Sequence, residues 1–283
     1  MELYENLTLD EERALYHVEN AQIRSCVFDG PADGESALKE CRNIQVENCD
    51  FRLRYPFWHC TGAVVENSRM TEGCRAALWY DRDVTLKHCE MNGIKALREC
   101  DESTVEDCRI ISPEFGWLCR GLTIRNTELT SEYPFFQCRN VEMDGLTLHG
   151  KYSFQYVENM VIRNSVLDTK DAFWHSRNVT VYDSVVKGEY LAWYSQSLRL
   201  VRCKIIGTQP LCYARDLVLE DCEMVDCDLS FEYSDVQATV RGEITSVKNP
   251  RSGRICAGSV GEVILDEFRD PEHHCEIVTG ENR

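Results

Sequence analysis

A nineteen-residue repeat constrains this chain more than any other feature of its sequence. The five tryptophans share one position of the repeat: Trp117 and Trp174 are three periods apart, and Trp174 and Trp193 are one period apart. Trp58 and Trp79 are separated by one period and a two-residue insertion. Repeats of this length cannot bury an apolar face singly, so successive repeats must stack on one another.

The repeat has the hydrophobic pattern of a strand. Apolar residues recur at its first, third and eighth positions, as in Val84, Leu86 and Met91, with polar residues such as Thr85 between them. This period-two alternation is typical of a half-buried strand, and Asn, Asp or Gly often closes the coil, as a corner with positive φ favours. The pattern predicts an all-β fold: a single-stranded right-handed parallel β-helix, a solenoid of about 19-residue coils.

The repeat also sets the expected domain boundaries. Residues 1–20 match the second half of a coil and are expected to form an N-terminal partial coil and cap, followed by β-helix repeats over residues 21–235. Residues 236–267 lose the period but contain two alternating segments, which we expect to be closing strands that protect the open end. Residues 268–283 show no pattern and are expected to be a mobile tail.

Charge restricts the partners and the compartment. The chain has 31 basic and 48 acidic residues and a formal net charge of −17. This balance argues against nucleic acid and against anionic membranes as partners. The first residues have no basic start before an apolar run, and no stretch approaches the length of a membrane span. We therefore expect a cytoplasmic protein.

The 16 cysteines follow the repeat and show no pairing pattern. One column contains Cys26, Cys49, Cys89, Cys108, Cys203 and Cys222, and another contains Cys41, Cys60, Cys100, Cys119 and Cys138. Other members of these columns are small residues such as Ser68 and Thr127, so we interpret the cysteines as reduced thiols packed in the core. No C-x-x-C pair suggests zinc, and we expect neither a metal nor a cofactor.

The chain resembles a known family in the segments DGPADGESALKECRN, LRYPFWH, CRAALWYDRDV, SPEFGW and LDTKDAFWHSRNV. They are similar to segments of an uncharacterised bacterial family, domain of unknown function 3737, and the likeness extends over roughly residues 5–265. The resemblance implies a right-handed single-stranded β-helix and agrees with the compartment inferred above. It supplies no activity and no catalytic residue.

Two adjacent columns of the repeat carry aromatic rings and ionisable groups. The fifteenth column consists of Tyr16, Lys39, Trp58, Trp79, Arg98, Trp117, Phe136, Gln155, Trp174, Trp193, Cys212 and Phe231. The sixteenth consists of His17, Glu40, His59, Tyr80, Glu99, Leu118, Gln137, Tyr156, His175, Tyr194, Tyr213 and Glu232. Charged members of both columns would lose too much hydration in a dry core, so we expect both columns to face outward.

A soluble protein rarely exposes so much aromatic surface without a use for it. The face favours binding or processing of an extended neutral glycan, because rings stack on sugar faces while polar groups bond hydroxyls; this rests partly on analogy with other β-helix proteins. An acidic surface repels polyuronates, so a neutral oligosaccharide is the expected partner. The expected ligand-binding residues are Trp58, His59, Trp79, Tyr80, Trp117, Phe136, Tyr156, Trp174, Trp193, Tyr194, Arg75 and Glu35.

The alternative hypothesis is a non-enzymatic scaffold. In that interpretation the same columns rigidify the solenoid or pack against another chain, including a second copy of this one. The sequence leaves both hypotheses open, and it leaves open whether the protein is an enzyme.

Catalysis on this face would need two carboxylates, or a carboxylate and a base. Asp81 and Glu99 occupy nearly equivalent places on adjacent coils, so we expect their carboxyl groups about 5 to 6 Å apart, as in a retaining glycosidase. Arg98 lies beside them, and Asp33 and Glu35 project from the longest loop. The simpler interpretation of these charges is a set of solvated ion pairs.

A second candidate cluster combines Asp171, Trp174, His175, Glu189, Trp193 and Tyr194. His175 together with Asp171 or Glu189 could act as an oriented base, although a surface ring is the simpler interpretation of His175. His59 and His175 are six coils apart, roughly 29 Å at the spacing of neighbouring strands, so they cannot share a metal.

Overall fold

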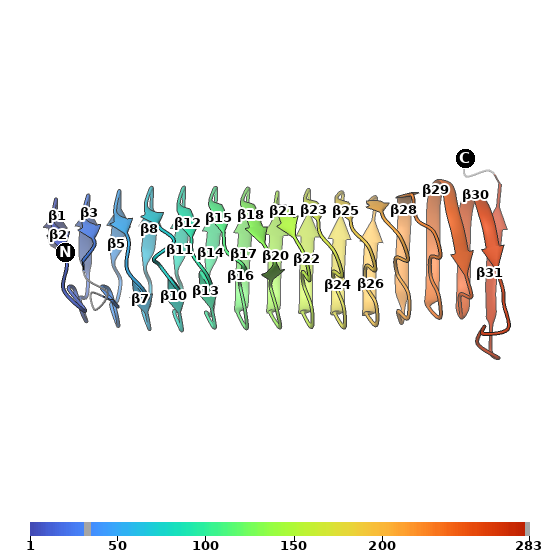
Figure 1. Cartoon of the computed structure of the whole chain (residues 1–283), viewed down its shortest axis with the longest axis horizontal. Coiled ribbons are helices and arrows are strands. Elements are labelled where there is room, and N and C mark those ends of the chain that lie inside the picture. Colours follow the sequence, from blue (N-terminus) through green and yellow to red (C-terminus); the bar gives the residue numbers. More distant parts are fainter. Residues whose placement is uncertain (31–34, 281–283) are drawn as a thin grey trace. The chain divides into compact units, whose positions relative to one another are not determined.

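The computed structural model describes residues 1–30 and 35–280. Within these residues the regular elements are strands, and no helix is present that could cross a membrane. The chain divides into two compact units, unit 1 (Met1–Thr147) and unit 2 (Leu148–Arg283). Each unit is a stack of parallel strands joined by turns (Figure 1). This architecture confirms the right-handed parallel β-helix predicted from the repeat.

Each coil of unit 1 contributes a strand to two parallel ladders. The first ladder contains β1 (Glu2–Glu5), β3 (Ala21–Arg24), β5 (Gln45–Glu47), β8 (Val64–Glu66), β11 (Thr85–Lys87), β14 (Thr104–Glu106), β17 (Arg120–Arg125) and β20 (Arg139–Asp144). The second contains β2 (Thr8–Leu9), β4 (Val27–Phe28), β6 (Asp50–Phe51), β9 (Arg69–Met70), β12 (Glu90–Asn92), β15 (Arg109–Ile111) and β18 (Glu128–Ser131).

Shorter strands form two small sheets at the positions that precede the corner of the coil. One contains β7 (Phe57–Trp58), β10 (Leu78–Trp79) and β13 (Leu97–Arg98), and the other contains β16 (Glu114–Phe115) and β19 (Tyr133–Pro134). Strand β21 (Thr147–Gly150) contains the boundary between the units.

Strand pairing follows the sequence repeat residue by residue. Leu86 of β11 lies opposite Val65 of β8 on one side and Val105 of β14 on the other, and all three side chains are buried. The parallel register therefore stacks each column of the repeat on itself. In the same way the Phe28 and Phe51 rings stack with centroids 4.7 Å apart, which gives the core its regular aliphatic and aromatic columns.

Unit 2 repeats this plan and ends in longer strands. One ladder contains β22 (Glu158–Arg163), β24 (Arg177–Tyr182), β26 (Gln196–Val201) and β28 (Leu217–Val225), and the other contains β23 (Val166–Asp168), β25 (Val185–Lys187) and β27 (Lys204–Ile206). β29 (Asp235–Lys248) and β30 (Ser252–Ile264) pair in parallel where closing strands are expected. β31 (His274–Thr279) pairs with β30 in a segment without a sequence pattern; the mobility of residues 268–283 stays a prediction.

The cysteines are free thiols, and all except Cys256 and Cys275 are buried. They also take part in the backbone network: the Cys89 N–H donates to the Cys108 sulfur (3.4 Å), and the Cys108 N–H donates to the Thr127 hydroxyl oxygen (3.4 Å). A thiol and a hydroxyl thus fill the same role in one column. This explains why cysteine, serine and threonine alternate there.

Candidate functional site

The two aromatic columns lie at different depths. Trp58 of β7, Trp79 of β10 and Arg98 of β13 lie in register and are half-buried. The residues that follow the two tryptophans, His59 and Tyr80, are exposed. The sixteenth column therefore forms an outer edge of unit 1, and the fifteenth lies partly beneath it instead of standing fully outside as the sequence predicts.

The rings of unit 1 cover one another's faces. Trp58 and Trp79 stack at 5.5 Å and 9°, and His59 and Tyr80 stack at 5.1 Å and 9°. The Lys39 ammonium lies 4.2 Å from the centre of the Trp58 ring, a cation–π contact. The expectation that sugars stack on free ring faces therefore needs correction, because these stacked rings offer a ligand mainly their edges.

Unit 2 shows a longer ladder of the same kind. His175 stacks between Tyr156 (4.9 Å) and Tyr194 (5.1 Å), and Tyr213 continues the ladder at 4.9 Å from Tyr194. Trp174 and Trp193 stack at 5.4 Å and 2°. Their indole N–H groups donate to the carbonyl oxygens of Tyr190 (2.7 Å) and Gln209 (2.9 Å). Both tryptophans are therefore tied to the next coil.

The last member of the sixteenth column differs from the sequence assignment. In most other coils the N–H of a sixteenth-column residue donates to the fifteenth-column carbonyl of the next coil, as His59 does to Trp79 (3.0 Å). Tyr213 donates to the Glu232 carbonyl (2.7 Å), and the Tyr213 and Tyr233 rings stack at 5.6 Å. Tyr233 is thus the sixteenth-column residue, because this coil holds one extra residue.

All members of the sixteenth column have a left-handed backbone. Their φ angles lie between 52° and 59° at His17, Glu40, His59, Tyr80, Glu99, Leu118, Gln137, Tyr156, His175, Tyr194, Tyr213 and Tyr233. This conformation costs a residue with a Cβ about 1–2 kcal/mol, less for Asn or Asp. The corner that closes the coil follows that rule, with Asn43, Gly62 and Asp83. The sixteenth column contains no Asn, Asp or Gly, so its larger side chains are kept despite the strain.

We name the exposed depression beside this column in unit 1 the Tyr80 hollow. It has a volume of about 520 Å³ and is lined by Arg42, His59, Thr61, Tyr80, Asp81, Arg82, Glu99 and Asp101. Four of these residues, Arg42, Thr61, Arg82 and Asp101, are not among those predicted from the sequence. These four residues share the eighteenth position of the repeat, where isolated bridges join them from coil to coil. The sequence pattern that could have identified these residues is therefore a column of polar residues directly after the cysteine column.

The charges of the Tyr80 hollow are locally balanced. The Arg98 guanidinium lies 2.9 Å from Glu99 Oε1, and the Arg82 guanidinium lies 3.8 Å from Asp101. Burial opposes ionisation of Glu99, but the hydrogen bond from Arg98 and the neighbouring Tyr80 and Trp79 side chains outweigh it and lower the Glu99 pKa. The hydrogen bond to Glu99 in turn raises the pKa of Tyr80. At neutral pH Glu99 is therefore a carboxylate, suited to accepting hydrogen bonds.

Asp81 does not lie where the sequence analysis placed it. Its side chain is only 1% exposed, and Oδ1 accepts the Cys60 N–H at 2.7 Å. Asp81 occupies the seventeenth position, the inward column of Cys60 and Cys100, whereas Glu99 belongs to the outward sixteenth column. The predicted pair of outer carboxylates is therefore wrong. Catalytic roles for Glu99 and Arg98 stay predictions.

The other predicted residues are distributed around unit 1. The Trp117 indole N–H donates to the Tyr133 carbonyl (2.6 Å), and its ring lies 5.1 Å from Phe136. Glu35 pairs with Arg54 at 2.8 Å, and Arg75 is exposed. Neither is among the residues that line the Tyr80 hollow. Asp33 lies outside the described residues.

The structure does not bring His175 and Asp171 of the second predicted cluster together as a base and its carboxylate partner. Asp171 is 8% exposed, and burial raises its pKa, against the opposing effect of Lys170. His175 is exposed and held between two tyrosine rings. No hydrogen bond or ion pair in the described part of unit 2 joins the two residues. Lys170 instead pairs with Glu189 at 3.0 Å.

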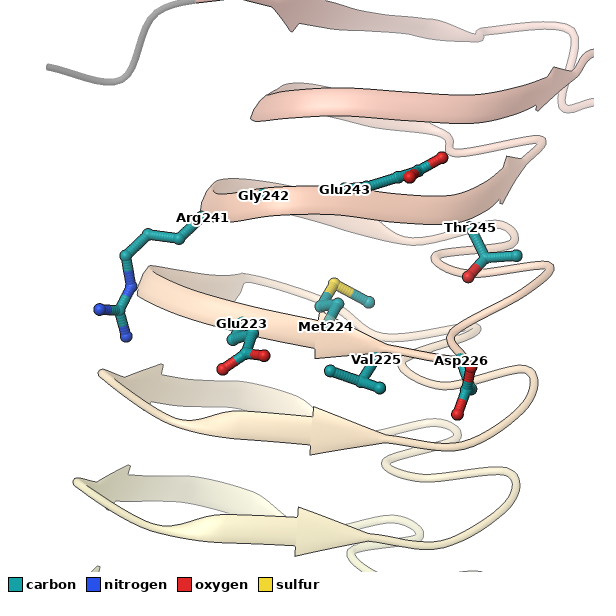
Figure 2. A pocket seen from close by; sticks show the side chains of 8 residues that line it. All are labelled: Glu223, Met224, Val225, Asp226, Arg241, Gly242, Glu243 and Thr245. Atoms are coloured by element: carbon teal, nitrogen blue, oxygen red, sulfur yellow. The ribbon is translucent and has the colours of Figure 1, made fainter.

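A second hollow lies in unit 2 between β28 and β29 (Figure 2). It has a volume of about 500 Å³ and is lined by Glu223, Met224, Val225, Asp226, Arg241, Gly242, Glu243 and Thr245. The β29–β30 register shifts between Val240 and Glu243, a bulge that includes Gly242. Among residues 1–30 and 35–280, no group of His, Cys, Asp or Glu is arranged to hold a metal ion.

Comparisons with known proteins identify a family. A family model described as "Protein of unknown function (DUF3737)" matches residues 2–278. No curated protein matches the chain. Solved structures with a similar chain path include DFA-IIIase from Arthrobacter chlorophenolicus A6 without its lid, at 9% identity and a TM-score of 0.44, covering 99% of this chain and 89% of that one.

Two further structures show a weaker likeness. The catalytic domain of GH87 alpha-1,3-glucanase in complex with tetrasaccharides has 9% identity and a TM-score of 0.38, with 99% of this chain and 64% of that chain covered. The tailspike protein of E. coli bacteriophage HK620 in complex with pentasaccharide has 10% identity and a TM-score of 0.33, with 99% and 67% covered. Likenesses this distant carry no inference about this chain.

Proposed function

The chain belongs to the family of proteins of unknown function DUF3737, and from its geometry we propose that it binds a neutral oligosaccharide in the Tyr80 hollow. The observation that carries this proposal is the hollow itself, about 520 Å³ in volume and bordered by the His59 and Tyr80 rings and by carboxylate and guanidinium groups. His59, Tyr80 and Glu99 have φ between 52° and 58°, as do the other members of the sixteenth column to within a degree. The polar lining of the hollow therefore distinguishes this stretch of the column, and the backbone conformation does not.

The lining of the hollow suits sugar hydroxyl groups. Glu99 and Asp101 offer hydrogen-bond acceptors, Arg42 and Arg82 offer donors, and the Tyr80 hydroxyl can both donate and accept. The ion pairs of the hollow neutralise most of its local charge, so no net charge is required of the ligand. Because the Tyr80 and His59 rings stack on each other, the sugar is held by hydrogen bonds to ring edges and neighbouring polar groups.

The ladder of unit 2 favours a second candidate function, the non-enzymatic scaffold. Its rings cover one another from Tyr156 to Tyr233, and Trp174 and Trp193 are fixed by hydrogen bonds to the next coil. Such a ladder stabilises the coils without any ligand. A second chain would pack against its exposed edges.

Binding can be tested with neutral oligosaccharides. We expect a short neutral oligosaccharide selected from a glycan array to bind the protein in calorimetry. Glu99→Gln should weaken binding about tenfold or more, because a hydrogen bond to a charged group contributes about 1.5–3 kcal/mol. Tyr80→Phe should weaken it about two- to tenfold, through loss of one neutral hydrogen bond.

Tyr194→Phe is the matched control, because Tyr194 has the same corner conformation and lies outside the Tyr80 hollow. Its affinity for the oligosaccharide should equal that of the wild type. Failure of every neutral oligosaccharide to bind, together with a concentration-dependent dimer that Trp174→Ala abolishes, would establish the scaffold instead.

A further inference from the structure

The seventeenth column of unit 1 holds one carboxyl group among thiols. From the second coil onward its members in this unit are Cys41, Cys60, Asp81, Cys100, Cys119 and Cys138, all of them buried. The Asp81 side chain is 1% exposed and follows directly after Tyr80. Asp81 is also one of the residues that border the Tyr80 hollow. An interior acid thus adjoins the corner that carries the proposed site.

Only one of the two oxygens of the Asp81 carboxyl group accepts a hydrogen bond. Oδ1 accepts the Cys60 N–H at 2.7 Å, whereas Oδ2 is buried without a partner in the described part of the chain. Among the described residues, none forms an ion pair with Asp81. The titratable groups around it are the thiols of Cys41, Cys60 and Cys100. An ionised carboxylate there would lack any compensating cation.

Neighbouring members of the column show which bonds this position can make. The Cys60 thiol donates to the Leu38 carbonyl (2.8 Å), and the Cys41 thiol donates to the Leu15 carbonyl (3.1 Å). In unit 2, the Ser234 hydroxyl accepts the Ala214 N–H (2.9 Å) and donates to the Leu211 carbonyl (2.7 Å). A Cys, Ser or Asp at this position can thus meet two main-chain needs, an acceptor for one N–H and a donor for one carbonyl, whereas the buried Val157 and Ala214 of the same column meet neither.

An aspartate can meet both needs only as a neutral acid. Oδ1 is the acceptor already observed, and a proton on Oδ2 would supply the missing donor. By register with Cys60 and Leu38, its acceptor would be the Phe57 carbonyl of the preceding coil. Protonation would thus account for the otherwise unpartnered oxygen.

We propose that Asp81 is a buried neutral acid that positions the Trp79–Tyr80 corner of the Tyr80 hollow, and that its ionisation loosens this corner. The role in ligand binding rests on the proposed function, whereas the protonation of Asp81 does not. Ionisation would place a charge among thiols and remove a hydrogen-bond donor. The corner would then relax toward water, and the hollow would lose the positions of His59, Tyr80 and Glu99.

The sign of the pH dependence follows from burial. Burial raises the pKa of Asp81 well above its ordinary value of 3.8, against the lowering effect of the Cys60 and Trp79 N–H groups. The stability contributed by Asp81 is therefore complete below that ordinary value and is lost as pH rises through the raised one. Asp183, which pairs with Arg202 at 2.6 Å, has a lowered pKa and contributes in the opposite direction.

The test compares denaturant midpoints of the wild type, Asp81→Asn and Asp183→Asn from about pH 2 to about pH 9, a range that spans the ordinary carboxyl values. Asparagine keeps both an acceptor and a donor. We expect the midpoint of Asp81→Asn to rise relative to the wild type as pH increases, and that of Asp183→Asn to fall relative to it. Equal pH slopes for the wild type and Asp81→Asn would overturn the proposal.

A spectroscopic measurement keeps the protonation testable even if a variant folds poorly. Infrared difference spectra of the wild type should show the C=O stretch of a protonated carboxyl at neutral pH, absent in Asp81→Asn. Its absence from the wild type would refute the neutral acid. Oligosaccharide affinity should also fall at alkaline pH in the wild type and less in Asp81→Asn; without any oligosaccharide binding, the stability and infrared results still decide the protonation independently.

Discussion

Replacing Phe51 by alanine should lower the free energy of unfolding by about 3 to 5 kcal/mol, the range observed for large aromatic truncations in cores. The Phe51 ring is fully buried. It stacks on Phe28 at 4.7 Å and 2° and contacts Phe57 at 5.1 Å. Its removal leaves a cavity between two coils that cannot collapse, because the ladder bonds on both sides fix the coil spacing.

Denaturant unfolding of the full chain, monitored by circular dichroism, measures this loss of stability. Leu118→Ala is the control, since Leu118 is 37% exposed and lies in the corner column. Its effect should stay within about 0.5 kcal/mol, as for most surface substitutions. A loss below about 1 kcal/mol for Phe51→Ala would mean that the aromatic column contributes little to the core.

Replacing Gly253 by alanine should destabilise unit 2 by about 3 kcal/mol or more, at the upper end of single-substitution effects. Gly253 lies in β30 with φ at +103°, and an added Cβ would lie 1.9 Å from the Val236 carbonyl oxygen of β29. The main chain of β29 cannot move away without breaking the β29–β30 ladder. Thermal unfolding gives the size of the effect.

Gly242→Ala separates this steric clash from simple backbone strain. Gly242 has φ at +78°, but an added Cβ would meet nothing within 4 Å. Its replacement should therefore cost only about 1 kcal/mol, the penalty of a left-handed alanine. Similar losses for both variants would show that contact with Val236 is not the source of the Gly253 requirement.

The sequence predicts the fold well because each column repeats one physical requirement. The apolar alternation around Leu86 predicts the inward column that joins Val65, Leu86 and Val105 in the structure. Parallel register follows, since any slip would turn these side chains outward. The strand spacing also implies that rings in one column cover each other's faces, which sequence analysis did not use for Trp58 and Trp79.

The candidate site was harder to predict because side-chain direction changes at the corner. Glu99 and Asp81 belong to adjacent columns, yet a left-handed residue at the sixteenth position turns the chain so that the seventeenth points inward. The residue type at position 81, taken alone, suggests an exposed acid. Its column predicts a buried one, because the neighbouring members Cys60 and Cys100 are small and buried.

Footprinting with hydroxyl radicals, with and without a bound oligosaccharide, tests the central claim most directly, because it reports which side chains a ligand covers. His59 and Tyr80 are exposed, and so are the reference residues His175 and Tyr194 in unit 2. All four rings are therefore open to reaction with the radical. We predict that the oligosaccharide protects His59 and Tyr80 and leaves His175 and Tyr194 unchanged. Protection confined to His175 and Tyr194, or none while calorimetry shows binding, would contradict the Tyr80 hollow as the site.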